Sequence, residues 1–194
     1  MILRCATSNA GNLREFQLAA GDISIAPVPN LSQIPPPVET GCSFAENAAL
    51  KAFYYSRFTD DPVFADDSGL EVDALAGAPG VSSARFAGPN ATDEQNNLLL
   101  LQRLAGAADR TARFVCVIVL ARQGSFIEAF HGAVGGQITS EPRGANGFGY
   151  DPLFFYEPFG CTFGEIDHKR KLLVSHRGQA LEALLTYCRD TFSR

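Results

Sequence analysis

A nearly continuous apolar run, ARFVCVIVLA, occupies residues 112–121. The run is rich in β-branched residues, which predicts a β-strand that lies in the centre of a sheet and is buried on both faces. Predicted strands and helices alternate along the rest of the chain, and this alternation favours the α/β class. We therefore expect an α/β fold with this strand at its centre.

Further strands are expected from short β-type patterns. Residues 1–6 predict a first strand, and residues 23–28 predict a short second one. Residues 125–131 and 133–139 predict two more strands, joined by a turn that contains a glycine. The polar residues between such strands are where we look for a site, because loops on a rigid frame are free to carry binding groups.

Helix starts are indicated by two pairs with the spacing of a capping box, Ser43 with Glu46 and Thr92 with Gln95. The first pair predicts a helix that ends at about Arg57, and the second precedes the leucine-rich run 98–104. A helix capped by Asn9 and a last helix over residues 178–190 are expected from apolar spacing. The residues expected to face inward are Leu13, Phe16 and Ala20 in the one, and Leu181, Leu184 and Leu185 in the other.

Composition narrows the class of protein. The chain has 194 residues, 46% of them apolar, which is enough for one globular domain over residues 1–194. The formal net charge of −5 argues against a general nucleic-acid binder. No apolar run reaches the roughly 18 residues that span a bilayer, and the 5 scattered cysteines suit a reducing cytosol. We expect a soluble cytoplasmic protein without nucleic-acid or membrane partners.

Two adjacent carboxylates, Asp66 and Asp67, follow the apolar residues 63–65 and precede Ser68 and Gly69. We expect them at the end of a strand, where neighbouring side chains point to opposite faces. Such carboxylates suit Mg²⁺, which prefers hard oxygen ligands, and one of them could act as a general base on water. The alternative is a polar turn without chemistry.

A second acidic position, Glu39, precedes the helix that carries Glu46 and Lys51. A cleft that holds Glu39 and Asp67, with or without Asp66, would suffice for one or two hydrated divalent ions. Glu39 could equally be a solvated loop charge, and Glu46 is interpreted as part of the helix cap. Lys51 is either a ligand contact or a surface lysine.

Two segments are suited to an anionic ligand. The segment TSNAGN, residues 7–12, lies between a strand and a helix, where backbone N–H groups and the helix dipole collect anions, although it lacks the P-loop pattern. The segment HKRKLLVSHRGQ, residues 168–179, is the only dense basic cluster and could offset a polyphosphate. A solvated basic face is the alternative for the second segment.

An aromatic residue between glycines, Phe148, stands in the segment NGFGYDPLFF, residues 146–155. Glycines on both sides leave such a ring exposed, and a purine stacks well on an exposed ring. The alternative is a glycine turn that leads into a strand with core aromatics.

In combination and in this order, these segments resemble the inosine triphosphate pyrophosphatases, also called non-standard purine nucleoside triphosphate pyrophosphatases. The likeness extends from residue 7 to about residue 185. The matching segments are TSNAGN, ETGCSFAENAALKA, FADDSGLEVDALAGAPGVSSARFAG, ARFVCVIVL, GFGYDPLFF and KLLVSHRGQAL.

The resemblance implies an elongated α/β fold with a long mixed β-sheet flanked by helices, and two lobes around a central nucleotide cleft. It also implies a homodimer and a Mg²⁺-dependent hydrolase. Such an enzyme converts a nucleoside triphosphate and water into the monophosphate and pyrophosphate. The implied substrates are the deaminated purine nucleotides ITP, dITP and XTP, which are removed from the nucleotide pool before they enter DNA or RNA.

The resemblance also assigns roles to residues of this chain. Asp67 is implied as the general base and a magnesium ligand, and Glu39 as the other acidic magnesium position. Phe148 is implied as the ring that stacks on the base, while His176 and Arg177 would read the purine oxygen at position six. The implied substrate contacts are Thr7, Ser8, Asn9, Ala10, Gly11 and Asn12 on the phosphate side, Ser68, then Phe148, Gly149, Tyr150 and Asp151 on the base side, and Lys171, His176 and Arg177.

One position departs from the family pattern, in which the first loop reads roughly [T/S]-x-N-x-x-K. Asn12 occupies the lysine position and carries no charge. Hydrogen bonds to charged groups contribute roughly 1.5–3 kcal/mol, so the change would weaken substrate binding about ten- to a hundredfold unless Arg14, Lys51 or Lys169 replaces the lysine. Two alternatives therefore stand beside the main hypothesis: a pyrophosphatase of another modified nucleotide, and a nucleotide sensor with weakened turnover.

Overall fold

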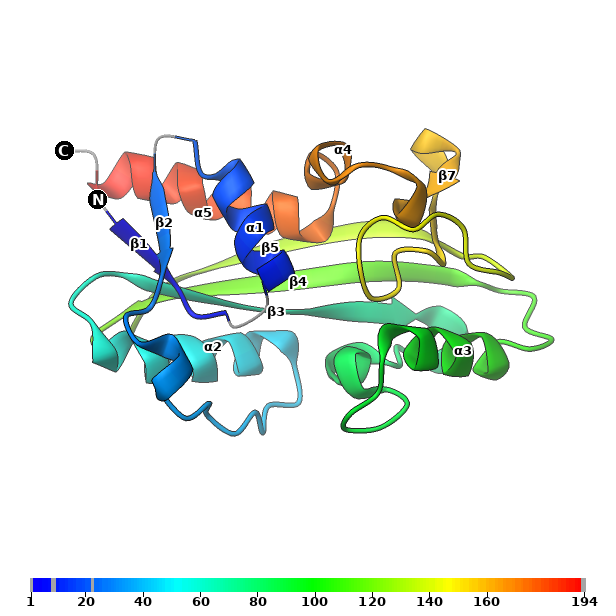
Figure 1. Ribbon diagram of the computed structural model, residues 1–194, viewed down its shortest axis with the longest axis horizontal. Coiled ribbons are helices and arrows are strands. Elements are labelled where there is room, and N and C mark those ends of the chain that lie inside the picture. Colours follow the sequence, from blue (N-terminus) through cyan, green and yellow to red (C-terminus); the bar gives the residue numbers. More distant parts are fainter. Residues whose placement is uncertain (1, 8–9, 22, 193–194) are drawn as a thin grey trace. The chain divides into compact units, whose positions relative to one another are not determined.

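The computed structural model describes residues 2–7, 10–21 and 23–192. Within these residues, seven strands form one sheet in the order β2-β1-β3-β4-β5-β6-β7 (Figure 1). β1 pairs in parallel with β2 and β3, whereas β6 pairs antiparallel with β5 and β7. The predicted α/β class with a mixed sheet is therefore confirmed. The strands are β1 Ile2–Cys5, β2 Ser24–Pro27, β3 Val63–Val72, β4 Thr111–Arg122, β5 Ser125–Ile138, β6 Phe154–Tyr156 and β7 Cys161–Thr162.

Strand β4 occupies the middle of this order, as the apolar run predicts. Every residue from Cys116 to Ala121 is buried, which fits a strand with both faces covered. Residues 111–115 instead alternate between exposed and buried positions, as in a strand with one covered face. The prediction of a doubly buried strand is confirmed for the second half of the run.

The chain divides into two compact units. The first unit consists of the described residues of Met1–Asp67, Cys116–Gly132 and His176–Arg194, and the second of Ser68–Val115 and Ala133–Ser175. The long strands β3, β4 and β5 contribute residues to both units. The expectation of a single domain over residues 1–194 stays a prediction.

Three helices pack on the strands of the first unit: α1 Ala10–Ala19, α2 Phe44–Tyr55 and α5 His176–Phe192. Figure 1 shows α1 and α5 on one side of these strands and α2 on the other. α1 contacts α5, and between them and the sheet lies an apolar core. The core confirms the inward faces expected for both helices, since it includes Phe16, Ala20, Leu181, Leu184 and Leu185, with Leu13 packed against it.

The second unit has its own core, built largely from aromatic rings. The rings of Phe114 and Phe154 lie 4.6 Å apart between centroids, and those of Phe154 and Phe163 lie 5.0 Å apart. Helix α3, Asp93–Arg103, and the short helix α4, His168–Leu172, belong to this unit. Leu100 of α3 is fully buried in the same core, so α3 is fixed against it by an apolar face.

The helix starts largely confirm the capping predictions. Thr92 and Gln95 form both hydrogen bonds of a capping box at the start of α3. The Ser43 hydroxyl accepts from the Glu46 N–H at 3.2 Å, but the Glu46 carboxylate accepts from the Cys42 N–H instead of completing the box. α5 begins at His176, slightly before the predicted residue 178. Asn9, the predicted cap of α1, lies outside the described residues.

One prediction about the sheet is wrong. Residues 125–131 and 133–139 do not form two strands, because β5 runs without interruption from Ser125 to Ile138. Gly132 was expected in a turn, but it serves close packing instead. A Cβ atom at Gly132 would overlap the carbonyl oxygen of His176 and would come within 2.8 Å of the Ala180 nitrogen. Glycine at this position therefore lets β5 and the first turn of α5 approach closely.

A second prediction is also wrong in its placement. Asp66 and Asp67 do not end a strand and do not form a turn, because β3 continues to Val72. Beyond the carboxylates, Leu70 and Val72 are fully buried in the core of the second unit, and the Leu70 N–H donates to the Ser83 hydroxyl at 2.9 Å. Both carboxylates therefore sit on a strand in the body of the sheet, where their directions are fixed.

Among the described helices, none is long and apolar enough to cross a bilayer.

Candidate active site

The two adjacent aspartates of β3 have separate sets of partners, as expected for neighbours on a strand. Asp67 accepts from Lys51 and Asn47, both on α2. Asp66 instead lies near Arg177 of α5 and Asn12 of α1. Figure 1 shows α2 and the α1–α5 pair on opposite sides of the strands of this unit. The prediction that the two carboxylates point to opposite faces is confirmed.

A cluster around Lys51 brings two of the predicted acidic residues together, and we call Glu39, Asn47, Lys51 and Asp67 the Lys51 cluster. The Lys51 ammonium lies 3.0 Å from Oδ1 of Asp67 and 3.5 Å from Oε2 of Glu39. Because both carboxylates contact the same ammonium, Oδ1 of Asp67 and Oε2 of Glu39 lie close to each other. The side chains of Lys51 and Asp67 each retain 15% exposure, and that of Glu39 retains 35%, so the cluster is accessible to a ligand.

Helix spacing places the two α2 residues of the cluster. Asn47 and Lys51 are four positions apart, so their side chains share one face of the helix. The Asn47 side chain also fixes the loop that follows Glu39, because its Oδ1 accepts from the Gly41 N–H at 2.8 Å while its Nδ2 donates to Asp67 at 3.4 Å. Asn47 was not among the sequence candidates, although the four-residue spacing to Lys51 was a signal that could have indicated it.

The charges of the cluster shift the pKa values of its members. Burial raises the pKa of Asp67 above its ordinary value, against the lowering effect of the Lys51 ammonium. For Lys51, burial alone would lower the pKa, but the carboxylates of Asp67, Asp66 and Glu39 together raise it. Lys51 is therefore held as a cation at neutral pH, and Asp67 is a stronger base than a solvated aspartate.

The donor set of the Lys51 cluster can be compared with the needs of a divalent ion. Mg²⁺ keeps several waters and is commonly held by one or two carboxylates together with substrate phosphates. Glu39 and Asp67 supply two hard oxygen ligands of that kind, both near one cation. Among the residues that the structure describes, no group of three or more His, Cys, Asp or Glu side chains is arranged to hold a metal. The residues thus fit a hydrated ion better than a metal enclosed by protein ligands.

Arg177 forms a buried ion pair in the first unit. Its Nη1 donates to Oε2 of Glu15 at 2.9 Å, and its Nε approaches Oδ2 of Asp66 at 3.5 Å. All three side chains are almost fully buried. Asn12 donates from Nδ2 to the same Asp66 oxygen at 3.4 Å, so the position that departs from the family lysine joins this network. Glu15 was missed at the sequence level, because no motif distinguished it from other helix glutamates.

The phosphate-side residues are placed only in part. Ser8 and Asn9 lie outside the described residues. Thr7 follows β1, whereas Ala10, Gly11 and Asn12 form the first turn of α1 and not a loop. Gly11 and Asn12 are half-buried. The segment therefore combines the end of a strand with the first turn of a helix, which is the position that the sequence predicted for anion binding.

The second unit holds the predicted base-side residues, and we call residues 146–151 the base-side loop. The Phe148 N–H donates to Oδ2 of Asp151 at 2.9 Å, and the same oxygen pairs with the Lys171 ammonium at 2.5 Å. The Lys171 ammonium also lies 4.7 Å from the centroid of the Phe148 ring, a cation–π distance. The pair of Lys171 and Asp151 is buried, whereas Phe148 is half-buried.

The basic cluster of residues 168–177 is divided by the fold. Lys171 is buried in its ion pair, and His176 and Arg177 are buried in the first turn of α5. Lys169 and Arg170 are exposed on α4, where Arg170 lies 4.8 Å from the Phe159 ring centroid. The interpretation of a uniform solvated face is therefore wrong.

The remaining predicted contact, Ser68, is half-buried on β3, directly after Asp67.

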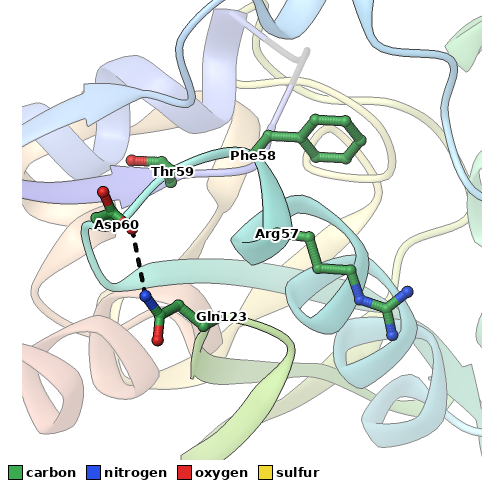
Figure 2. Close-up of a pocket in the computed structure, with 5 residues that line it drawn as sticks. All are labelled: Arg57, Phe58, Thr59, Asp60 and Gln123. Atoms are coloured by element: carbon green, nitrogen blue, oxygen red, sulfur yellow. Dashed lines mark hydrogen bonds between the residues drawn. The ribbon is translucent and has the colours of Figure 1, made fainter.

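A pocket of about 440 Å³ lies in the first unit, and none of the predicted site residues lines it (Figure 2). The Gln123 side chain donates to Oδ1 of Asp60 at 3.2 Å across this pocket. Its lining is mostly exposed side chains, and its charged residues are Arg57 and Asp60. The pocket is therefore no substitute for the Lys51 cluster. The lining residues are Arg57, Phe58, Thr59, Asp60 and Gln123.

Comparison with known proteins gives consistent matches along nearly the whole chain. A model described as the Ham1 family matches residues 3–187. A dITP/XTP pyrophosphatase of Acidobacterium capsulatum is 50% identical over 196 residues, which cover 95% of this chain and 97% of that protein. A dITP/XTP pyrophosphatase of an Exiguobacterium species is 47% identical, with 95% of both chains covered.

A solved structure shows the same architecture. The structure of a HAM1 protein from Coxiella burnetii superposes with a TM-score of 0.90 at 41% sequence identity. The match covers 98% of this chain and 100% of that one. The mixed sheet with flanking helices is thus shared with a protein of clear sequence similarity.

Proposed function

The chain belongs to the Ham1 family, and on this premise we propose that it hydrolyses deaminated purine nucleoside triphosphates to the monophosphate and pyrophosphate. The substrates are ITP, dITP and XTP, and the role is to remove them from the nucleotide pool. The observation that carries the proposal is the convergence of Glu39 and Asp67 on Lys51. It supplies the paired carboxylates that the reaction requires, in the family whose curated relatives are dITP/XTP pyrophosphatases.

Asp67 is the general base of this proposal. It accepts the proton of the attacking water while a bond forms from the water oxygen to the α-phosphorus. The bond from the α-phosphorus to the bridging oxygen breaks, and pyrophosphate leaves. The raised pKa of Asp67, caused mainly by its burial, makes the carboxylate a better proton acceptor once it is ionised. Lys51 keeps it oriented through the 3.0 Å contact.

Glu39 and Asp67 would hold Mg²⁺, which supplies charge stabilisation to the phosphates and lowers the pKa of bound water. Thr7, Ser8, Asn9, Ala10, Gly11 and Asn12 are proposed as the phosphate-side contacts, with Ser68. Phe148 stacks on the base, with Gly149, Tyr150 and Asp151 beside it. Lys171, His176 and Arg177 complete the substrate contacts, and His176 and Arg177 favour a six-oxo purine over adenine.

The product of ITP hydrolysis tests the activity. The protein is incubated with ITP and Mg²⁺, and pyrophosphate and inorganic phosphate are measured separately. We expect pyrophosphate and IMP, with far slower turnover of ATP, GTP, CTP and UTP. Release of single phosphates would contradict cleavage at the α-phosphorus, and equal turnover of all the triphosphates would favour a pyrophosphatase of other nucleotides. EDTA should abolish the reaction, and Mg²⁺ should restore it.

A second candidate is a nucleotide sensor, and Asn12 in the family lysine position favours it. A sensor would bind ITP without releasing pyrophosphate in the presence of Mg²⁺, so the same assay combined with calorimetry distinguishes the two. We further propose that the protein is a cytoplasmic homodimer that binds neither membranes nor nucleic acid. Light scattering of the purified chain tests the dimer, because a monomer mass at micromolar concentration would contradict it.

A further inference from the structure

Helix α3 contacts the base-side loop at Gly149. The Gly149 N–H donates to Oδ2 of Asp93 at 2.6 Å, and the Gly149 carbonyl accepts from Nδ2 of Asn97 at 3.0 Å. Asp93 and Asn97 are four residues apart and share one face of the helix. Both backbone polar groups of one loop residue are thus held by side chains of α3, and we call this arrangement the Gly149 clamp.

Gly149 lies inside a turn that Asp151 closes, because the Asp151 N–H donates to the Phe148 carbonyl at 3.3 Å and the Asp151 carboxylate accepts from the Phe148 N–H. The clamp adds hydrogen bonds to the peptide groups of Gly149 itself. Gly149 has φ +62°, and a Cβ atom there would meet nothing within 4 Å. On either side the loop is tied to the second unit: the Asn146 N–H donates to the Gly164 carbonyl at 2.9 Å, and Asp151 pairs with Lys171. Without the clamp, a glycine with wide backbone freedom would connect Phe148 to Tyr150.

Asn97 has a buried oxygen that is unpaired among the described residues, which is unfavourable for the stability of the fold. The residue is only 8% exposed, and within the described part of the chain its Oδ1 is buried without a hydrogen-bond partner. An unpaired buried acceptor is unfavourable, and an apolar residue of the same size would avoid it. The presence of an amide at position 97 is therefore best explained by its Nδ2 group, which donates to the Gly149 carbonyl.

We propose that Asp93 and Asn97 are positioning residues for the purine base: by holding Gly149, they fix the Phe148 ring in the orientation that stacks on the base. This inference rests on the proposed function. Neither residue belongs to a motif that the sequence singled out for substrate binding, and Asp93 and Asn97 act only through the backbone of the base-side loop. Loss of the clamp should weaken nucleotide binding and leave the chemical step unchanged.

The variants are Asn97→Leu, Asp93→Ala and Asp93→Asn, with two matched controls. Glu94→Gln removes the same charge from the first turn of α3, and Gln102→Ala removes an exposed amide from the same helix. Asp93→Asn keeps an oxygen acceptor for the Gly149 N–H and should restore most of the effect of Asp93→Ala. Asn97→Leu removes the unpaired acceptor and also the hydrogen bond to the Gly149 carbonyl, two opposing effects on stability, so its melting temperature should stay close to that of the natural protein.

Steady-state kinetics with ITP and calorimetry with IMP give the main result. Asn97→Leu and Asp93→Ala should each raise KM about three- to tenfold and weaken IMP binding by the same factor, as expected for one lost hydrogen bond. The value of kcat should stay within about twofold. A drop in kcat at constant KM, or unchanged KM and IMP affinity in an active protein, would overturn the proposal.

Hydrogen exchange of the base-side loop separates this inference from the proposed function. The Gly149 amide should exchange faster in Asp93→Ala than in the natural protein and in Glu94→Gln, whether or not ITP is a substrate. Unchanged protection at Gly149 would overturn the clamp. If the natural protein neither hydrolyses ITP nor binds IMP, the proposed function fails, and the role of the clamp in base binding fails with it even where the exchange result holds.

Discussion

The Lys51 ammonium lies 3.0 Å from Oδ1 of Asp67 and 3.5 Å from Oε2 of Glu39. The Lys51 ammonium on α2 thus contacts both the Asp67 carboxylate on β3 and the Glu39 carboxylate in the loop before α2. Two carboxylates this close would repel each other without a cation between them. The arrangement brings Glu39, Lys51 and Asp67 together from separate segments of the sequence. A substitution of Asp67 therefore tests the proposed chemistry directly.

Asp67→Asn should reduce pyrophosphate release from ITP about 10²- to 10⁴-fold, the range typical for loss of a general base. ITP binding should remain detectable by calorimetry, because the base-side residues are untouched. Asp60→Asn, an exposed aspartate just before β3, is the matched control and should keep full activity. A rate for Asp67→Asn within a few-fold of the natural protein would show that another group takes the proton.

Asn12→Lys should lower the KM for ITP about tenfold or more, because a lysine would add a charged hydrogen bond to the phosphates. Asn12 is half-buried and contacts Asp66 at 3.4 Å, so a lysine there would also face a carboxylate. Asn12→Gln, which has no charge, is the control for side-chain length. An unchanged KM in Asn12→Lys would mean that another cation already serves the phosphates.

The sequence predicted those parts of the fold that local patterns determine. The apolar run gave β4, since burial on both faces leaves no alternation to misread. Thr92 and Gln95 marked the start of α3 because a capping box satisfies backbone groups locally. The division of 125–139 into two strands failed, since a glycine in a turn and a glycine at a close contact look the same in sequence.

The main residues of the candidate site were predicted from a resemblance, but the residues that contact them were not predicted. Asp67 and Glu39 were named, but Asn47 and Glu15 contact the site from helix positions without a distinguishing motif. Asp93 and Asn97 were not among the sequence candidates, because their contact with Gly149 joins segments 52 to 56 residues apart. Long-range pairing of this kind depends on the tertiary fold, and no local spacing encodes it.

The thiols should differ sharply in reactivity. Cys42 is exposed, whereas Cys5, Cys116 and Cys188 are buried. Burial raises the pKa of Cys188 to about 11, so its thiolate, the reactive form, is on the order of 10⁻³ of the total at pH 8. A raised thiol pKa means that reactivity increases as the pH rises towards that value.

Mass spectrometry after brief iodoacetamide treatment at pH 8 checks this expectation. Cys42 should be labelled in the folded protein, and all 5 cysteines should be labelled in denaturant. Cys42→Ser is the control, because it should remove the fast-labelled site. Rapid labelling of Cys188 without denaturant would contradict its burial on the inner face of α5.

Gly132→Ala should destabilise the protein by about 1–3 kcal/mol, the usual effect of overpacking. A Cβ atom at residue 132 would overlap the carbonyl oxygen of His176, a backbone atom that cannot turn aside as a side chain would. Gly135→Ala is the matched control on the same strand, because a Cβ atom there meets nothing within 4 Å. That control should be neutral or slightly stabilising, since alanine loses less backbone entropy than glycine on folding. Urea unfolding of both variants measures the difference, and equal midpoints would mean that β5 and α5 do not approach as closely as the structure shows.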